Sequence, residues 1–209
     1  MKTKDKILSA ALGLFNEYGL DAVTLRQIAS EVGISQGNLN YHFPKKEDIV
    51  EALYQQLVTR INVDFDQLEK TNPTLEVLFT LGKKTLLALY DYRFIMLDFV
   101  RLMKQHPGVQ QHFKALNALR RQQYAQMFQA LEQQQLMLPE EFPEQYDHLM
   151  IQFSILGDYW ISSAEILRDD LSTEAKISYY LKILVSSLYP NLTHRGKQEF
   201  LRLLQNMEI

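Results

Sequence analysis

Two carboxamide side chains, those of Gln36 and Asn40, lie four residues apart in a short polar segment near the start of the chain. On a helix this spacing places both on one face. Each carboxamide can both donate to and accept from the edge of an adenine base, so the pair can read bases in the major groove of DNA. Tyr41 and His42 follow directly and can donate to phosphate oxygens. The segment therefore predicts a DNA-reading helix, with a simple solvent-exposed polar face as the alternative.

Lys45 and Lys46 add positive charge beside this segment. They stand at the expected start of the next helix, where the helix dipole disfavours cations and favours acids such as Glu47 and Asp48. We therefore expect the two lysines to serve an external anion, such as a DNA phosphate. Gly37 costs a helix about 1 kcal/mol relative to alanine. Its presence indicates close approach of another backbone, either from DNA or from within the protein.

Two helix starts and one glycine turn would position these groups. Thr24 can cap a first helix, and Gln27 three residues later can complete a capping box. Ser35 can cap a second helix, and Gly33 can form the turn between the two. The apolar residues expected between the two helices are Ile28, Ala29, Val32, Ile34, Leu39 and Phe43. Two short helices around one tight turn indicate a helix-turn-helix.

A further helix precedes these two. Its apolar residues recur at helical spacing, and Gly19 can end it. They are Ile7, Ala11, Leu14 and Phe15. Three helices are enough to enclose a small core, so we predict a helix-turn-helix domain over residues 1–46.

Residues 47–209 show no sustained alternation of apolar and polar side chains, so we expect no strand there. A long helix is predicted from about Lys45 towards Glu69, with Asn72 and Pro73 ending it. Later prolines, glycines and polar clusters divide the remainder into five or six helices. The sequence thus predicts an all-α fold of about nine or ten helices, in which a helical bundle over residues 47–209 follows the first domain; the family resemblance described below implies that this bundle binds a ligand and forms the dimer.

Charge is unevenly distributed along the 209 residues, whose formal net charge is -3. Residues 1–46 hold six Lys or Arg against four Asp or Glu, and the remainder holds sixteen against twenty-one. The positive excess lies in the predicted DNA-binding domain, but it is small, so we expect a dimer to collect enough phosphate contacts. The chain has no cysteine, and no stretch resembles a signal peptide or a membrane span. We therefore expect a cytoplasmic protein with no disulfide, no metal, no cofactor and no membrane partner.

The run from Ile7 to Ile49, which includes AALGLFNEYG, TLRQIASEVGIS and GNLNYHFPKKEDI, resembles the DNA-binding domain of the TetR family of bacterial transcriptional regulators. The resemblance implies a homodimer that reads a pseudo-palindromic operator in double-stranded DNA. The base contacts that it implies come from Arg26, Gln36, Gly37 and Asn40. The phosphate contacts that it implies come from Thr24, Asn38, Tyr41, His42 and Lys46. Family members usually carry tyrosine where this chain has Asn40, which leaves Tyr41 as the nearer aromatic donor to phosphate.

Two long apolar segments near the end of the chain are the expected dimer interface. The first is too broadly apolar to have one solvent-facing half. In the arrangement that the resemblance implies, two helices from each subunit form a four-helix bundle; two helices buried in one core are the alternative. The predicted interface residues are Leu149, Ile155, Leu156, Ile161, Leu181, Leu184 and Leu188.

Aromatic and methionine side chains in the second domain predict either a pocket for a small apolar or aromatic effector or an ordinary core. Polar groups inside apolar stretches distinguish a pocket from an ordinary core better than apolar side chains do. Asp98, Asp158 and Glu165 must each be paired, exposed or in contact with a ligand. The predicted pocket residues are Phe99, Met103, Phe128, Phe153, Asp158 and Trp160.

These observations predict a DNA-binding repressor that a small molecule releases. A DNA-binding regulator controlled by a protein partner instead of a small ligand is the alternative. An enzyme is disfavoured, and we expect no catalytic residue. The chain has no phosphate-binding glycine loop, and His106 and His112 lack the spacing of a dedicated metal site.

Overall fold

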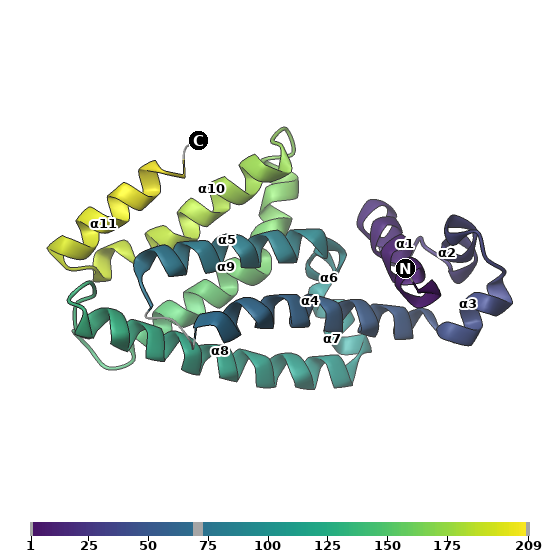
Figure 1. Cartoon of the computed structure of the whole chain (residues 1–209), viewed down its shortest axis with the longest axis horizontal. Coiled ribbons are helices and arrows are strands. Elements are labelled where there is room, and N and C mark those ends of the chain that lie inside the picture. Colours follow the sequence, from purple (N-terminus) through teal and green to yellow (C-terminus); the bar gives the residue numbers. More distant parts are fainter. Residues whose placement is uncertain (1, 69–72, 208–209) are drawn as a thin grey trace.

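The computed structural model describes residues 2–68 and 73–207, and over these residues the chain is helical (Figure 1). The described residues contain no β-strand, only one isolated bridge between Met137 and Leu192. The helices are α1 (Thr3–Tyr18), α2 (Leu25–Val32), α3 (Gln36–His42), α4 (Lys46–Leu68), α5 (Leu75–Asp91), α6 (Arg93–Leu97), α7 (Phe99–Gln105), α8 (Pro107–Gln133), α9 (Gln145–Leu167), α10 (Thr173–Ser186), the 3-10 helix η1 (Tyr189–Asn191) and α11 (His194–Gln205). The all-α prediction is confirmed, with slightly more helices than expected.

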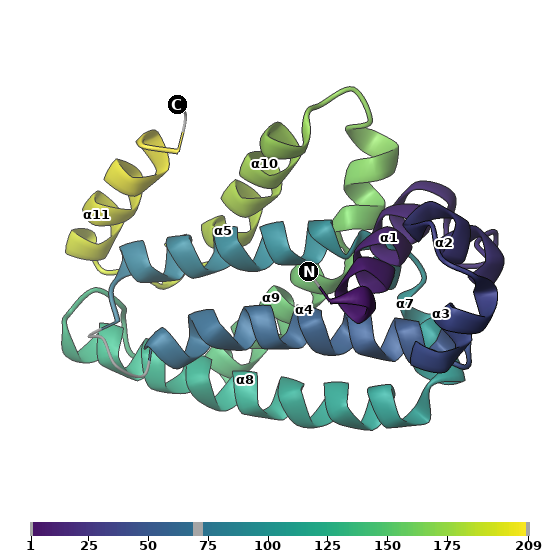
Figure 2. The same ribbon diagram turned by 45° about the vertical axis from the view of Figure 1, so that its right-hand side comes forward.

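The first three helices form a small unit at one end of the molecule, and α11 lies at the other end (Figures 1 and 2). The Thr24 hydroxyl accepts a hydrogen bond from the Gln27 amide at 3.3 Å, and the Gln27 side chain accepts one from the Thr24 amide at 2.8 Å. Gly33 ends α2 with a left-handed φ of 74°. Ser35 Oγ accepts from the Asn38 amide at 3.1 Å and caps α3. The predicted capping box, turn and second cap are all confirmed.

The core of this unit contains most of the apolar residues predicted for it. Val32, Ile34 and Leu14 are half-buried at its margin and pack against it. The fully enclosed members are Ile7, Ala11, Phe15, Ile28, Ala29, Leu39 and Phe43. Because the inward faces of α2 and α3 are buried in this core, their remaining faces are available to solvent or to a partner.

Helix α4 connects this unit to the rest of the chain. Ile49, Leu53 and Leu57 on one of its faces are buried, as their spacing predicted. The helix contacts α1 near its start and packs against α5 and α8 further along. Glu69 and Asn72, which the sequence placed at its end, lie outside the described residues.

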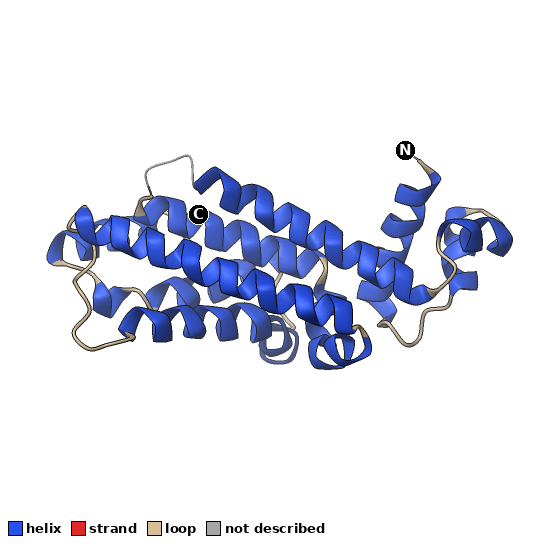
Figure 3. Cartoon of the chain, turned by 90° about the horizontal axis from the view of Figure 1, so that it is seen from below, coloured by secondary structure: helices blue, strands red, loops and turns tan. Residues whose placement is uncertain are grey.

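The remaining helices form a bundle whose long members run along the length of the molecule (Figure 3). Helix α5 packs against α4, α10 and α11, and α8 packs against α9. This bundle encloses the second part of the hydrophobic core.

The segment between α5 and α8 folds as two short helices, although neither contains a proline or glycine. The backbone leaves regular helical geometry at Tyr92 and at Asp98. The Asn16 side chain, from α1, accepts a hydrogen bond from the Phe94 amide at 3.1 Å and donates one to the Asp91 carbonyl at 2.7 Å. The backbone groups freed at the first break are thus satisfied by a residue of the N-terminal unit. This long-range contact explains why the sequence predicted fewer helices.

Candidate functional site

Helix α3 has one buried side and one exposed side. Leu39 and Phe43 are enclosed in the core, whereas Gln36 and Asn40 are exposed. Tyr41 is 84% exposed. The two carboxamides therefore face away from the protein, as their four-residue spacing predicted.

Gly37 lies on the same exposed side of α3. A Cβ atom built at this position would meet no neighbouring atom closer than Ser35 Oγ, at 4.0 Å. Packing within the described part of the chain therefore does not require glycine here. The sequence offered two reasons for Gly37, close approach of a backbone from DNA or from within the protein. The first of these is the one that remains.

The other predicted contact residues differ in how free their polar groups are. Arg26 and Asn38 are exposed. The Thr24 hydroxyl both donates and accepts within the capping box, so it is already partnered. His42 is half-buried, and its ring lies edge-on to Tyr41 with centroids 5.2 Å apart.

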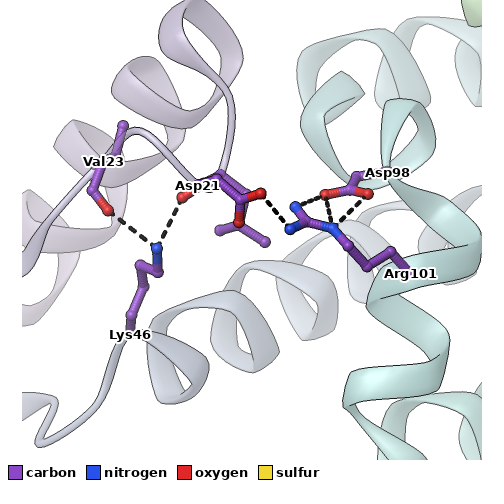
Figure 4. Close-up of polar contacts among 6 residues, drawn as sticks. Asp21, Val23, Lys46, Asp98 and Arg101 are labelled. Carbon is purple, nitrogen blue, oxygen red and sulfur yellow. Dashed lines mark hydrogen bonds and ion pairs between the residues drawn. The ribbon is translucent and has the colours of Figure 1, made fainter.

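Lys46 is bound inside the protein rather than free at its surface (Figure 4). Its ammonium group donates to the Leu20 carbonyl at 2.9 Å and to the Val23 carbonyl at 3.1 Å. These bonds close the loop between α1 and α2 onto the start of α4. This geometry disfavours the phosphate role predicted for Lys46, and the neighbouring Lys45 has the more exposed side chain. No local pattern signalled contacts to residues more than twenty positions earlier in the chain.

A second polar contact joins the N-terminal unit to α7 (Figure 4). The Arg101 guanidinium donates to the carboxylate of Asp21 and also to that of Asp98, the latter from Nε at 2.8 Å. The hydrogen bond from Arg101 holds the pKa of Asp21 below its ordinary value. The sequence indicated Asp98 as a polar group needing an explanation, but it gave no signal for Arg101 or Asp21.

The second unit contains a mostly apolar cavity of about 150 Å³. Helices α4, α5, α8, α9 and α10 all contribute to its walls. The lining residues are Ile61, Phe65, Gly82, Thr85, Leu86, Leu89, Phe113, Leu116, Asn117, Arg120, Tyr124, Phe153, Ser154, Gly157, Asp158 and Leu184. A pocket with apolar walls and a few polar groups is the usual form of a small-molecule site.

Two of the six predicted pocket residues, Phe153 and Asp158, line this cavity. The other four do not. Phe128 lies behind the wall, with its ring 6.2 Å from that of Phe153. Trp160 stacks on Tyr90 with ring centroids 5.9 Å apart. Phe99 and Met103 belong to α7, outside the lining; Phe99 packs against the lining residue Phe113, at 5.0 Å between ring centroids, and Met103 is buried in the core. Met103, Phe128 and Trp160 were mistaken for pocket residues because an aromatic or methionine side chain in a core has the same helical spacing, whereas Phe99 lines a different pocket together with Arg101 and Tyr159.

Of the three acidic residues that required an explanation, only one lacks a partner. Asp98 accepts from Arg101. Glu165 accepts from Lys176 at 2.9 Å and from the Tyr90 hydroxyl at 3.0 Å. The described residues offer Asp158 no hydrogen bond or ion pair, and burial raises the pKa of its carboxyl to about 7.

Further polar residues line the cavity, among them Arg120 and Thr85. The Arg120 guanidinium lies over the Phe65 ring at 3.6 Å, and burial lowers the pKa of this arginine. It donates to the side-chain oxygens of Gln123, at 2.6 Å, and of Asn62. Thr85 Oγ1 is buried without a hydrogen-bond partner among the described residues.

Two family models match this chain. One, described as "Bacterial transcriptional repressor", covers residues 46–200, and the other, described as "Bacterial regulatory proteins, tetR family", covers residues 7–53. The chain belongs to the TetR family. The resemblance seen in the sequence near the N-terminus therefore extends over nearly the whole chain, and the TetR assignment covers both the helix-turn-helix and the bundle.

Individual relatives match over only part of the chain. The chain is 44% identical over 55 residues to the HTH-type transcriptional regulator RutR of Escherichia coli (strain K12), and the matched residues make up 26% of each chain. Over 77 residues it is 35% identical to the biofilm operon icaADBC HTH-type negative transcriptional regulator IcaR of Staphylococcus aureus (strain Newman), which is 36% of this chain and 41% of IcaR. The matches thus span well under half the length of these relatives.

Solved structures extend the similarity to the whole fold. A TetR-family transcriptional regulator from Marinobacter aquaeolei VT8 has a TM-score of 0.89 at 23% identity, with both chains fully covered. A transcriptional regulator from Saccharomonospora viridis, solved in complex with choline, has a TM-score of 0.72 at 22% identity and covers 90% of this chain and 96% of its own. At these identities the structures show a shared TetR fold.

In this TetR-family chain the two helices predicted to form a dimer interface are α9 and α10. Leu149, Ile161, Leu181 and Leu188 are enclosed in the core of a single subunit, so the structure corrects their assignment to the interface. Ile155 is 56% exposed, and Leu156 and Leu184 are half-buried. The exposed apolar residues of the two helices are Ile151, Ile155, Tyr159, Ile166, Leu167, Tyr179 and Ile183.

Across the described residues, no helix combines the length and the hydropathy that crossing a membrane requires.

Proposed function

We propose that this chain is a cytoplasmic, homodimeric repressor that binds a pseudo-palindromic operator and releases it when a small molecule occupies the cavity. Residues 1–46 serve as the DNA-binding part, and residues 47–209 serve as the dimerisation and effector part. The observation that carries the proposal is the outer side of α3. There two carboxamides and an open glycine lie exposed opposite a fully enclosed apolar side.

Base reading belongs to the exposed groups on α2 and α3. Gln36 and Asn40 each offer a carboxamide suited to adenine, and Arg26 offers a guanidinium suited to guanine. Gly37 lets the α3 backbone approach the groove closely. Family members usually have tyrosine in place of Asn40, so we expect this chain to prefer a different base at that operator position.

Phosphate contacts position the helix but do not read sequence. Tyr41, Asn38 and His42 are suited to this role by their place on or beside α3. Thr24 can share its hydroxyl with a phosphate while it caps α2. Lys45 replaces Lys46 as the lysine that meets the DNA backbone.

Dimerisation is required because one N-terminal unit carries little excess positive charge and reads only one half-site. The exposed apolar residues of α9 recur along one side of the helix, at Ile151, Ile155, Tyr159 and Ile166. Tyr179 and Ile183 add apolar surface on α10. Two such surfaces brought together by a twofold axis would bury these side chains from water.

The cavity is the site proposed for the effector. Its walls are mostly apolar, and it adjoins α7, which contacts the N-terminal unit through Arg101. The structure of the Saccharomonospora viridis regulator with choline supports the view that this fold accommodates small molecules.

Selection of binding sites from the organism's genome, followed by footprinting, tests the DNA-binding part of this proposal. We expect two half-sites related by a pseudo-palindrome, with centres about one helical turn or more apart. Gln36→Ala and Asn40→Ala should each relax specificity at particular operator positions, by about 1–3 kcal/mol. A single asymmetric site would contradict the homodimer. Equal losses on operator and random DNA would contradict base reading by these two residues.

A further inference from the structure

Asp158 is the one acidic residue that lines the cavity. The neighbouring acids Glu165 on α9 and Asp98 before α7 are both neutralised by basic partners. Asp158 has no such partner among the described residues. The Asp158 side chain is half-buried, and a carboxyl group partly withdrawn from water without a partner is disfavoured in its ionised form, so its position in a cavity wall indicates a partner that comes from outside.

Arg120 is the one basic residue in the same walls, and it is engaged elsewhere. Its guanidinium donates to Gln123 and Asn62 and stacks on Phe65. These contacts direct its hydrogen-bonding capacity toward α4 and its own helix. The cavity therefore presents a cation that already has side-chain partners and a carboxyl group that has none among the described residues.

The remaining walls suit an apolar body that carries a positive charge. Aromatic rings attract cations through their π faces, most strongly where water is excluded. The volume of about 150 Å³ matches the size of a cavity known to hold a benzene molecule. The unpartnered Thr85 hydroxyl can accept one hydrogen bond from a ligand. The aromatic lining residues are Phe65, Phe113, Tyr124 and Phe153.

We propose that this cavity binds a compact organic cation, an ammonium group on an apolar body about the size of a benzene ring, with Asp158 as its counter-ion. The inference rests on the proposed function, which requires an effector site, and it names the chemical class of that effector. The ammonium group donates to the Asp158 carboxylate, and the apolar body displaces water from the aromatic walls.

Proton exchange is a direct consequence of this pairing. With a pKa near 7, Asp158 is largely protonated at pH 6 and largely ionised at pH 8. A bound ammonium favours the ionised form, so binding at pH 6 expels a proton, and affinity rises roughly tenfold between pH 6 and pH 8. The other titratable groups lining the cavity are Arg120 and Tyr124, both on α8, while the lining residues of α4, α5 and α10 carry none. Burial raises the pKa of Tyr124 to about 12, so Tyr124 stays neutral in this range.

Calorimetry on the full chain without DNA tests the proposal. Benzylamine, benzyl alcohol and benzoate share nearly one shape and differ in charge. We expect benzylamine to bind roughly 10- to 100-fold more tightly than benzyl alcohol, since a hydrogen bond to a charged group contributes that much. Asp158→Asn, which is nearly isosteric, should abolish the preference and its pH dependence and leave benzyl alcohol binding unchanged. Asp147→Asn is the matched control, because Asp147 lies on the same helix but pairs with Arg121 outside the cavity.

Each other result overturns the proposal. Tightest binding of benzoate would make Arg120 the anchor, and equal binding of all three would describe a purely apolar site. A failure of all three to bind would exclude ligands of this size. Operator release is measured separately by fluorescence anisotropy. If benzylamine binds through Asp158 without weakening operator affinity, the proposed effector control fails and the inference about the cavity stands.

Discussion

The guanidinium of Arg101 on α7 donates to the carboxylate of Asp21, which lies between α1 and α2. Asp98 accepts from the same guanidinium and holds it in place. Two residues before Arg101, Phe99 packs against Phe113 in the cavity wall. Helix α7 thus packs against a residue of the cavity wall and also contacts the DNA-binding unit. A ligand that shifts Phe113 has a short physical route to the helix-turn-helix.

Breaking this ion pair should weaken the coupling between the two parts. Asp21→Asn and Arg101→Gln should leave ligand affinity nearly unchanged in the absence of DNA, because neither residue lines the cavity. Both should reduce the ligand-induced drop in operator affinity, measured by anisotropy with and without ligand. Arg121→Gln is the control. It removes an ion pair with Asp147 at the surface of the bundle and should retain the full response. An unchanged response in Asp21→Asn would exclude this route.

Of the two neighbouring lysines at the start of α4, we expect substitution of Lys45 to affect DNA binding and substitution of Lys46 to affect protein stability. Lys45→Ala should weaken operator and random DNA alike and reduce the slope of log affinity against log salt by about one, without changing the melting temperature. Lys46→Ala should destabilise the protein by about 1–3 kcal/mol, because two backbone carbonyls lose a charged donor. Salt titrations and thermal denaturation of both variants check this division. A stable Lys46→Ala protein with a reduced salt slope would restore the phosphate role of Lys46.

Replacement of Gly37 should raise stability and lower operator affinity together. A methyl group there meets open space in the free protein, so Gly37→Ala should stabilise α3 by at most about 1 kcal/mol. The same methyl group would obstruct close approach to DNA. Gly13→Ala on α1, where a Cβ also meets nothing within 4 Å, should stabilise the protein without any effect on DNA. Equal operator affinity in the two variants would mean that DNA does not approach Gly37 closely.

The ionisation of Asp158 should appear in the pH dependence of folding. Its pKa is raised from 3.8 to about 7, so the native state holds a proton that the unfolded chain releases at lower pH. Stability from this group is therefore complete below about pH 4 and is lost as the pH rises through 7. Relative to the wild type, Asp158→Asn should gain stability over this range, by at most about 4 kcal/mol. Urea denaturation at several pH values measures the difference, and a difference that does not vary with pH would contradict the assignment.

The dimer surface can be tested at its most exposed aliphatic position near the middle of α9. Ile155→Asp should shift the protein from dimer to monomer in sedimentation experiments and lower operator affinity, because a charge would replace an apolar contact at the twofold axis. Val63→Asp on α4 places a charge on a similarly exposed apolar residue and should leave the dimer intact. Dissociation by both substitutions would indicate a different interface.

Much of the N-terminal unit follows from short-range patterns. The caps at Thr24 and Ser35 and the two sides of α3 were predictable because they depend on residues within about one helical turn of one another. The exposed apolar residues of α9 were harder to identify. Leu149 and Ile155 have the same apolar character in the sequence, yet one is enclosed and the other exposed. Which side of a broadly apolar helix faces its own core depends on the helices packed against it.

The sequence by itself determined the helical class, the helix-turn-helix, the exposed polar side of its second helix and the resemblance to TetR, since capping and apolar periodicity are local properties. Only the tertiary structure decided that the Lys46 ammonium binds two backbone carbonyls, and that Asp158 alone among the three acids within apolar stretches lacks a partner among the described residues. Polar contacts of this kind join residues that are far apart in the sequence. Asp21 and Arg101, for example, are 80 positions apart. Such pairs form where packed helices bring side chains together, and a local pattern does not specify that packing.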